Sequence, residues 1–203
     1  NELFLRFGDA PSGLKFDASD VGALTADPVV LLPTTQAGVY YVLVRGVSQP
    51  AADTSVSLLA DLLPFSITDV SPDRGGAASY VTTTIRGAKF DSMAIVKLVR
   101  PGIAEYEPVS YQVLDATRII ATFDLADAPH GLYDIKVANP GGEVAVIPYR
   151  FLVERALEPE IAVGLGGPRI IAPGDVGRFG FSLLNQGNVD LPYVQFQYGV
   201  PEV

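Results

Sequence analysis

Cysteine, tryptophan and any second histidine are missing from this chain. With no Cys and one His in 203 residues, the sequence excludes disulfides, thiolate chemistry, Cys/His zinc sites and proton relays between two histidines. The lack of cysteine does not decide the cellular compartment. Basic residues are also scarce, at 14 against 23 acidic ones, and they form no cluster. We therefore expect no nucleic-acid interface, because phosphate binding needs stripes of Lys and Arg.

Long hydrophobic runs are absent as well. The longest uninterrupted one, residues 39–44, has the length of a strand and is far short of a membrane helix. We expect no membrane insertion from this segment. The chain opens at Asn1 without a Met or a signal peptide, and this pattern is typical of an internal fragment of a longer protein.

The residues that are present favour an ordered protein rich in turns. Hydrophobic residues make up 48% and charged residues 18%, which indicates a sizeable core. There are 20 glycines and 16 prolines, more than a typical globular chain contains. The length suits one large β domain or two small ones.

Period-2 alternation dominates the pattern, and helical periodicity is almost absent. The stripes with one apolar face are Val81, Thr83 and Ile85; Ile119, Ala121, Phe123 and Leu125; Tyr133, Ile135 and Val137; and Tyr149, Phe151 and Val153. One buried and one wet face, with turn signals every 8–12 residues, predicts an all-β fold of tandem, antiparallel immunoglobulin-like β-sandwich domains.

A short internal sequence repeat indicates the length of the repeating unit. GVYYVLV at 38–44 matches GLYDIKV at 131–137, 93 residues later. Two joints, at 62–65 and 153–160, each contain a proline and no Gly/Ser tract, so we expect them to be stiff. The predicted division is therefore 1–63, 64–153 and 154–203, with the third unit begun and cut short.

The middle unit resembles the IPT/TIG family of immunoglobulin-like domains. Three motifs carry the resemblance in order: ITDVSP at 67–72 followed by Gly75 and Gly76, VTTTIRGAKF at 81–90, and GLYDIKVANPGG at 131–142 followed by YRF at 149–151. In this alignment Gly87 and Gly141 suit turns with positive φ, and Phe90 and Tyr133 would fill the core.

Resemblances also extend to the two flanks. AGVYYVLVRG at 37–46 and VSLLA at 56–60 make residues 1–63 similar to the end of a bacterial prepeptidase C-terminal (PPC-like) β domain. IAPG at 171–174 and LNQGN at 184–188 make the last segment similar to the start of a CARDB-like adhesion module. Together these resemblances imply a large secreted or surface-anchored bacterial or archaeal protein.

No catalytic, cofactor-binding or metal-binding residue is predicted. His130 lacks a second ligand and is interpreted as a turn residue. Glu105 and Glu107 would lie on one strand face or in one loop and cannot flank a glycoside, so we interpret them as an edge charge cluster.

Other candidates are weaker still. The acidic turns at 17–20 and 69–73 leave structural calcium open, although neither has EF-hand spacing. The glycines at 164–167 lack the Lys and Ser/Thr of a phosphate loop. Surface pairing with carboxylates is expected for four scattered arginines: Arg100, Arg118, Arg150 and Arg155. The aromatic residues best suited to stack on a sugar are Tyr193, Phe196 and Tyr198, and we expect them to alternate into a core that this segment leaves incomplete.

These observations favour a non-catalytic structural or adhesion segment that spaces and presents other modules at the cell surface. Its expected partners are neighbouring domains and, through open sheet edges, other copies of itself. An alternative is a polysaccharide-binding accessory domain of a secreted hydrolase, with a glycan as partner. The PPC-like resemblance alone implies a third alternative, a domain that assists a secreted peptidase.

Overall fold

The computed structural model describes residues 1–22, 26–47, 55–77, 79–167, 170, 174, 176–195 and 197. Within these ranges the secondary structure is entirely β, arranged in four sheets, and no helix occurs. The prediction of an all-β chain is thus confirmed for the described residues. The same ranges contain no helix capable of crossing a membrane.

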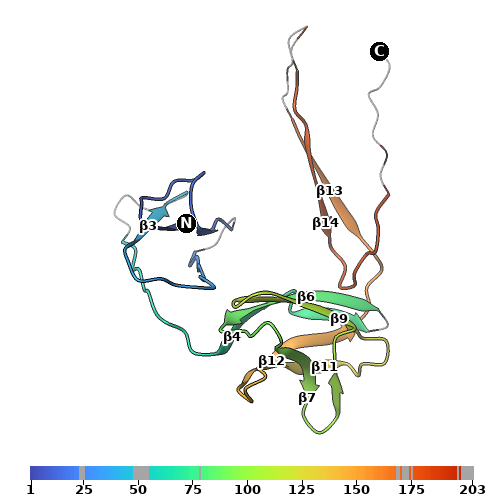
Figure 1. Ribbon diagram of the computed structural model, residues 1–203. Coiled ribbons are helices and arrows are strands. Elements are labelled where there is room, and N and C mark those ends of the chain that lie inside the picture. Colours follow the sequence, from blue (N-terminus) through green and yellow to red (C-terminus); the bar gives the residue numbers. More distant parts are fainter. Residues whose placement is uncertain are drawn as a thin grey trace.

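The N-terminal sheet has three antiparallel strands in the order β2-β1-β3. Phe4 is its buried centre, 5.5 Å from the ring of Phe16, and the guanidinium of Arg45 lies over its other side. Figure 1 shows this sheet apart from the rest of the chain, at the blue end. Its strands are β1 (Glu2–Phe7), β2 (Ala18–Asp20) and β3 (Tyr40–Arg45).

Two larger sheets, which we call the central sheets, share one core (Figure 1). One has the order β4-β6-β10-β9 and the other β5-β12-β11-β7-β8. Neighbouring strands are antiparallel except for β5, which pairs parallel to β12. The bounds are β4 (Ser66–Ser71), β5 (Arg74–Ala77), β6 (Tyr80–Ala88), β7 (Ile95–Arg100), β8 (Ala104–Tyr106), β9 (Ser110–Asp115), β10 (Arg118–Asp124), β11 (Gly131–Ala138) and β12 (Val144–Arg155).

The core of the central sheets follows the period-2 pattern of the sequence. Every second residue of β6, β10 and β11 is buried, and the residues between them are exposed or half-buried. The one polar side chain in this set, Thr83, donates its hydroxyl hydrogen to the carbonyl of Pro72 at 2.7 Å. Fully enclosed residues come from both sheets: Ile85, Val96, Leu98, Ile119, Ala121, Phe123, Tyr133, Ile135, Val137, Phe151 and Val153.

Tyr149 departs from this pattern, and its predicted core position is wrong. On β11 one residue separates Tyr133 from Ile135, whereas three separate their partners Phe151 and Ile147 on β12. The extra residues loop out, with Tyr149 in the left-handed region (φ 52°) and 68% exposed. A bulge of this kind redirects a side chain, and in this strand it turns Tyr149 to solvent.

The two glycines predicted to have positive φ do not have it. The left-handed position of the β11–β12 turn is Gly142 (φ 87°), one residue after Gly141. Gly87 is needed for space instead, because a Cβ there would lie 2.1 Å from the carbonyl oxygen of Ser66 and 2.5 Å from the ring of Phe90. Phe90 itself is buried, as expected.

The two similar sequence segments, 38–44 and 131–137, also share a backbone conformation and a tyrosine hydrogen bond. Gly38 (φ 151°) precedes β3 and Gly131 (φ 145°) begins β11, so the two glycines share an unusual backbone conformation. The tyrosine two residues later bonds back to the backbone in each case. The Tyr133 hydroxyl donates to the Pro129 carbonyl at 2.8 Å, and the Tyr40 hydroxyl accepts the amide hydrogen of Gln36 at 2.9 Å.

The C-terminal strands β13 (Ile161–Gly166) and β14 (Gly180–Asn185) form a two-stranded antiparallel ribbon. Figure 1 shows this ribbon projecting from the central sheets. Its register places most of the large apolar side chains on one face. That face carries Ile161, Val163, Leu165, Phe181, Leu183 and the polar Asn185, and the other carries Ala162, Gly164, Gly166, Gly180, Ser182 and Leu184.

We predict that Tyr133→Phe destabilises the central sheets. The substitution keeps the ring but removes the donor to the Pro129 carbonyl, and a lost part-buried hydrogen bond costs about 1–2 kcal/mol. Urea unfolding followed by tyrosine fluorescence measures the effect. Tyr149→Phe, at an exposed ring, is the matched control and should leave the midpoint unchanged. Equal midpoints for Tyr133→Phe and the unsubstituted protein would contradict the assignment.

Candidate functional site

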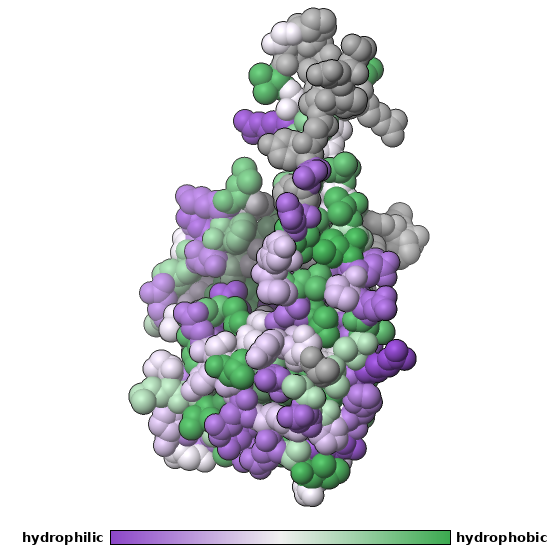
Figure 2. Space-filling model, turned by 90° about the vertical axis from the view of Figure 1, so that its right-hand side faces the viewer, coloured by the Kyte–Doolittle hydropathy of each residue, from purple (hydrophilic) through white to green (hydrophobic). Residues whose placement is uncertain are grey.

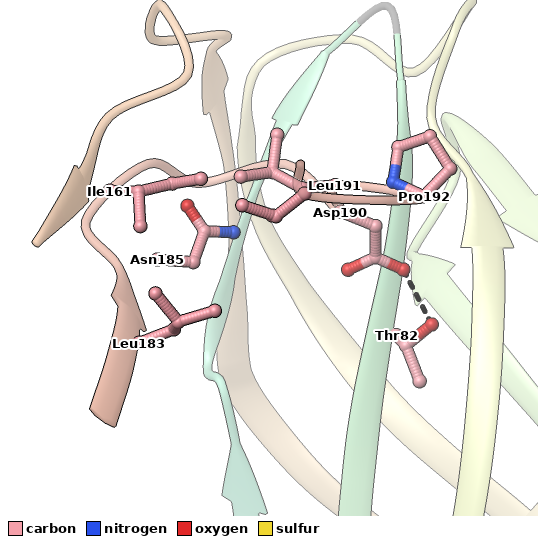
Figure 3. A pocket seen from close by; sticks show the side chains of 8 residues that line it. Thr82, Ile161, Leu183, Asn185, Asp190, Leu191 and Pro192 are labelled. Atoms are coloured by element: carbon pink, nitrogen blue, oxygen red, sulfur yellow. Dashed lines mark hydrogen bonds between the residues drawn. The ribbon is translucent and has the colours of Figure 1, made fainter. Parts of the chain in front are cut away.

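An open groove of about 460 Å³ lies where the ribbon meets the central sheets (Figure 3). Its floor on the central side is Thr82 of β6, and the ribbon supplies Ile161, Leu183 and Asn185. The chain that follows β14 closes the remaining side. Its lining residues there are Asp190, Leu191, Pro192 and Val194.

The polar side chains of the groove are occupied by bonds within the protein. Thr82 donates its hydroxyl hydrogen to the Asp190 carboxylate at 2.5 Å, the contact drawn in Figure 3, and lies 2.9 Å from the Thr122 hydroxyl. The Asn185 amide donates to the Val189 carbonyl at 2.8 Å and accepts from the Gly187 amide at 2.9 Å. The groove is therefore built mainly as a contact between segments.

The loop at 186–190, which we call the joint loop, is bonded to the central sheets through Asn188 and Asp190. Asn188 is its centre and is buried. The Asn188 side chain accepts from the Leu157 amide at 2.9 Å, and it donates to the Arg155 carbonyl at 2.9 Å and to the Glu154 carboxylate at 3.2 Å. A buried amide with all these partners fixes the chain on both sides of it.

Backbone pairing and packing complete the joint loop. The Gly76 amide donates to the Asn188 carbonyl at 2.6 Å, and the Asp190 amide donates to the Tyr80 carbonyl at 2.9 Å. Gly76 also permits close approach, since a Cβ there would lie 2.7 Å from both Val189 and the Asn188 amide oxygen. Val189 is buried, and its side chain lies close to Gly76. The joint loop thus closes one end of the central sheets.

The predicted carboxylate pair does not form a catalytic arrangement. Glu105 and Glu107 both contact the ammonium of Lys97, at 3.5 and 3.0 Å, beside the edge strand β8. The hydrogen bond to Glu107 raises the pKa of Lys97 above its ordinary value, and the negative charges of both glutamates add to the shift. The cluster is an ion-paired sheet edge, which agrees with its interpretation from the sequence.

The acidic turns considered for calcium use their oxygens within the protein. Asp17 accepts the Phe7 amide at 2.7 Å, and Asp20 accepts the amides of Gly22 and Val29 at 3.1 and 2.9 Å. In the second turn, Asp69 pairs with Arg150 at 2.8 Å, while Asp73 contacts Arg74 at 3.4 Å. Among the described residues, no three His, Cys, Asp or Glu side chains gather as a metal site would require.

His130 and Arg100 lie at the turn that enters β11. The His130 carbonyl accepts from the Arg100 guanidinium at 2.8 Å, and the guanidinium lies over the ring of Tyr133. Burial raises the pKa of the Tyr133 phenol above its ordinary value. His130 is itself exposed, and its structural part in this turn is that of a backbone acceptor.

The other candidates are scattered. Arg118 pairs with Asp115 at 3.5 Å, as expected for surface pairing, whereas Arg155 contributes its carbonyl to the joint loop. The glycine-rich stretch lies largely in β13, so it forms a strand where a phosphate site needs a loop. Tyr193 is 78% exposed, so its predicted place in a core that this segment leaves incomplete stays a prediction. Phe196 and Tyr198 lie outside the described residues.

The residues of the joint loop were not predicted as a site. The sequence does mark them, because Asn185, Gly187 and Asn188 belong to the motif that carries the CARDB-like resemblance. Both partners lie far away in the chain: Gly76 follows the first IPT/TIG-like motif, and Leu157 belongs to no motif. Spacing within the motif could not reveal these contacts.

Comparison with known proteins adds no family assignment. No protein-family model matches the chain, and a search of curated proteins finds no similar sequence.

We predict that Asn188→Ala loosens the joint loop while leaving the central core folded. The substitution removes the partner of the Leu157 amide and of the Arg155 carbonyl, and each lost part-buried hydrogen bond costs about 1 kcal/mol. Hydrogen exchange at 76, 157 and 188–190 should accelerate at least tenfold. Gln186→Ala, an exposed position in the same loop, is the control. Unchanged exchange in Asn188→Ala would contradict this account.

Limited trypsin digestion should distinguish the two arginines near the ribbon. Arg155 ends β12, where its backbone pairs with β5 and bonds to Asn188, whereas Arg178 is exposed and precedes β14. Because proteases need an extended, unpaired segment, the first cut near the ribbon is expected at Arg178. Mass spectrometry of the early fragments identifies the site, and initial cleavage at Arg155 would contradict the prediction.

Proposed function

We propose that this chain is a non-catalytic structural segment that holds neighbouring modules of a larger extracellular or cell-surface protein at defined positions. The joint loop is the observation that carries the proposal. Two of its five residues, Asn188 and Asp190, bond to three separate parts of the central sheets: β5, the start of β6 and the end of β12. A connection of this kind transmits orientation from one module to the next.

The central sheets support an immunoglobulin-like sandwich as the spacing unit. Two sheets over one core, with alternating inward residues, are the architecture of that class. The hydrogen bond from Tyr133 to the backbone four residues upstream is similar to the tyrosine corner of such domains. With the IPT/TIG resemblance at 64–153, these features make the middle unit our proposed spacer, flanked by units at 1–63 and 154–203.

The chemistry of the ionisable groups agrees with a non-catalytic role. The carboxylates considered as catalytic or calcium-binding residues are engaged by Lys97, by arginines or by backbone amides. Catalytic acids and bases usually have environments that leave them free to exchange protons with a substrate. The proposed partners are therefore neighbouring domains of the same polypeptide.

Distance measurements between spin labels test whether the ribbon is held in place. The chain has no cysteine, so Met93→Cys on the central sheets and Leu184→Cys on the ribbon give a clean pair of exposed labels. Spin-diluted double electron–electron resonance should give one narrow distance distribution. Adding Asn188→Ala should broaden it, because the joint loop then detaches.

A second label pair provides the comparison. Residues 55–64 have no strand pairing, so labels at Leu14→Cys and Met93→Cys should give a broad distribution. The ribbon pair is compared in the labelled protein that keeps Asn188. A distance distribution for that pair as broad as the one for the Leu14 pair would contradict the proposed spacer function.

A second candidate function is polysaccharide binding, and Tyr149 favours it. Its ring is 68% exposed at a non-glycine residue with φ 52°, held by the bond from its amide to the Asp134 carboxylate at 2.8 Å. Strained, exposed aromatic residues recur at binding sites, and a tyrosine ring can stack on a sugar. Affinity electrophoresis in soluble polysaccharide gels tests this: retardation should disappear in Tyr149→Ala and persist in Tyr193→Ala. Equal mobility with and without polysaccharide rejects this candidate.

A further inference from the structure

Strand β9 leaves one edge of the central sheets open. It pairs with β10 on one side, and among the described strands none pairs with it on the other. Ser110, Tyr111 and Gln112 are exposed, and no hydrogen bond from another described segment reaches the free side of the strand. The strand is uncharged up to Asp115, and its register with β10 is regular from Ser110 to Val113. A regular, uncharged edge offers its amide and carbonyl groups to another strand.

The other three edges of the central sheets are each protected. The joint loop bonds to the backbone of β5. Strand β8 has only three residues, and its Glu105 is paired with Lys97. Strand β4 contains a register shift, and Asp69 just after it is paired with Arg150 of the other sheet. Short strands, bulges and charges keep natural edges from pairing, and the stretch 110–113 of β9 lacks all of them.

The core side of β9 is incomplete at this edge. Tyr111 and Val113 lie opposite Ala121 and Ile119 of β10, which are fully buried, so all four side chains are on the core face. Val113 packs against the core, whereas Tyr111 remains 44% exposed. A further strand beside β9 would extend the apolar layer and cover the Tyr111 ring.

We propose that two copies of this chain pair β9 to β9, antiparallel about a two-fold axis that passes through Tyr111 perpendicular to the sheet. Tyr111 then lies opposite Tyr111 of the second copy. On the same face Val109 lies opposite Val113, and on the outer face Ser110 lies opposite Gln112. The axis keeps the two core faces on one side, so apolar residues meet apolar residues and polar residues meet polar ones.

This contact closes after two copies. Both copies use the same strand, and a contact of a surface with itself about a two-fold axis gives a dimer. Each four-stranded sheet then continues into its copy through main-chain hydrogen bonds. The contact is one strand wide, smaller than the roughly 1,600 Å² of a standard interface, so we expect a reversible equilibrium between monomer and dimer.

Charges at the ends of the paired stretch are compensated within each copy. The register brings Asp115 of one copy toward Glu107 of the other. Asp115 is paired with Arg118, and Glu107 with Lys97. Neither acid lies within 109–113, where the strands pair.

The outer face of the other central sheet is the competing contact. Val144 and Val146 of β12 are about half exposed there, but Lys97 and Lys136 lie side by side on the same face. Two copies that met through this face would bring these lysines together. On the side drawn in Figure 2, hydrophobic side chains of the central sheets are scattered among hydrophilic ones. Pairing through an edge needs no continuous apolar face.

Sedimentation velocity of the full 203-residue chain tests the proposal. The unsubstituted protein should change from monomer to dimer as its concentration rises, without larger species. Two variants, Ser110→Lys with Gln112→Lys and Ser110→Glu with Gln112→Glu, each place like charges directly opposite one another twice in the dimer. Each should weaken association at least about tenfold. An equal mixture of the two variants should dimerise again, because every lysine then faces a glutamate.

A control variant carries the same two glutamates on the competing face. Val144→Glu with Val146→Glu should dimerise like the unsubstituted protein, and circular dichroism confirms that each variant is folded. A monomeric unsubstituted protein overturns the proposal. A dimer that persists in both β9 variants, or one that is lost in the control variant, overturns it as well.

Disulfide trapping tests the register, and the absence of native cysteine makes it specific. Directly opposite residues have Cα atoms about 4.5–5.5 Å apart, within reach of a disulfide, whereas diagonal neighbours are about 7–8 Å apart. Under mild oxidation, a mixture of Ser110→Cys and Gln112→Cys proteins should therefore form several times more covalent dimer than either protein alone. Equal yields in all three samples would overturn the axis at Tyr111.

Discussion

Each central strand has one apolar face, and that face leaves water only when a second sheet covers it. The inward residues of β6 and β10 meet those of β7, β11 and β12, so neither sheet would be stable without the other. Tyr133 is the largest enclosed side chain, and its hydroxyl is bonded to the turn before its own strand. The turn at β11 is therefore fixed by the same residue that fills the core.

The alternating pattern allowed most of this core to be predicted, because burial of one strand face is a local property of the sequence. Ile85, Phe123 and Ile135 lie inside as their spacing indicates. Tyr149 was misplaced because the bulge depends on Asp134 of the neighbouring strand, which bonds the Tyr149 amide. Gly87 was predicted to be glycine because of a positive φ. The structure requires glycine there because Ser66 and Phe90 leave no space for a Cβ. Both errors concern contacts between segments.

The joint loop shows the same limit for the candidate site. Asn188 and Val189 follow a recognisable turn motif, yet their importance comes from Gly76, Arg155 and Leu157, which the sequence leaves unconnected to them. A polar side chain is predictable as a site when its chemistry is rare, as with cysteine or histidine. Asparagine is common in turns, so only its burial among main-chain partners distinguishes this one.

The two joints differ in the kind of interaction that they make, and this difference separates rigid from adaptable parts of the chain. The C-terminal joint has a buried asparagine, paired backbone and a glycine that admits Val189. At the N-terminal joint, Phe65 packs against Phe90 at 6.3 Å, while residues 56–62 expose apolar side chains to water. Apolar exposure in an extended segment is costly unless something covers it. The C-terminal joint is therefore held by directional hydrogen bonds, whereas at the N-terminal joint an aromatic contact lies next to a segment whose apolar side chains stay exposed.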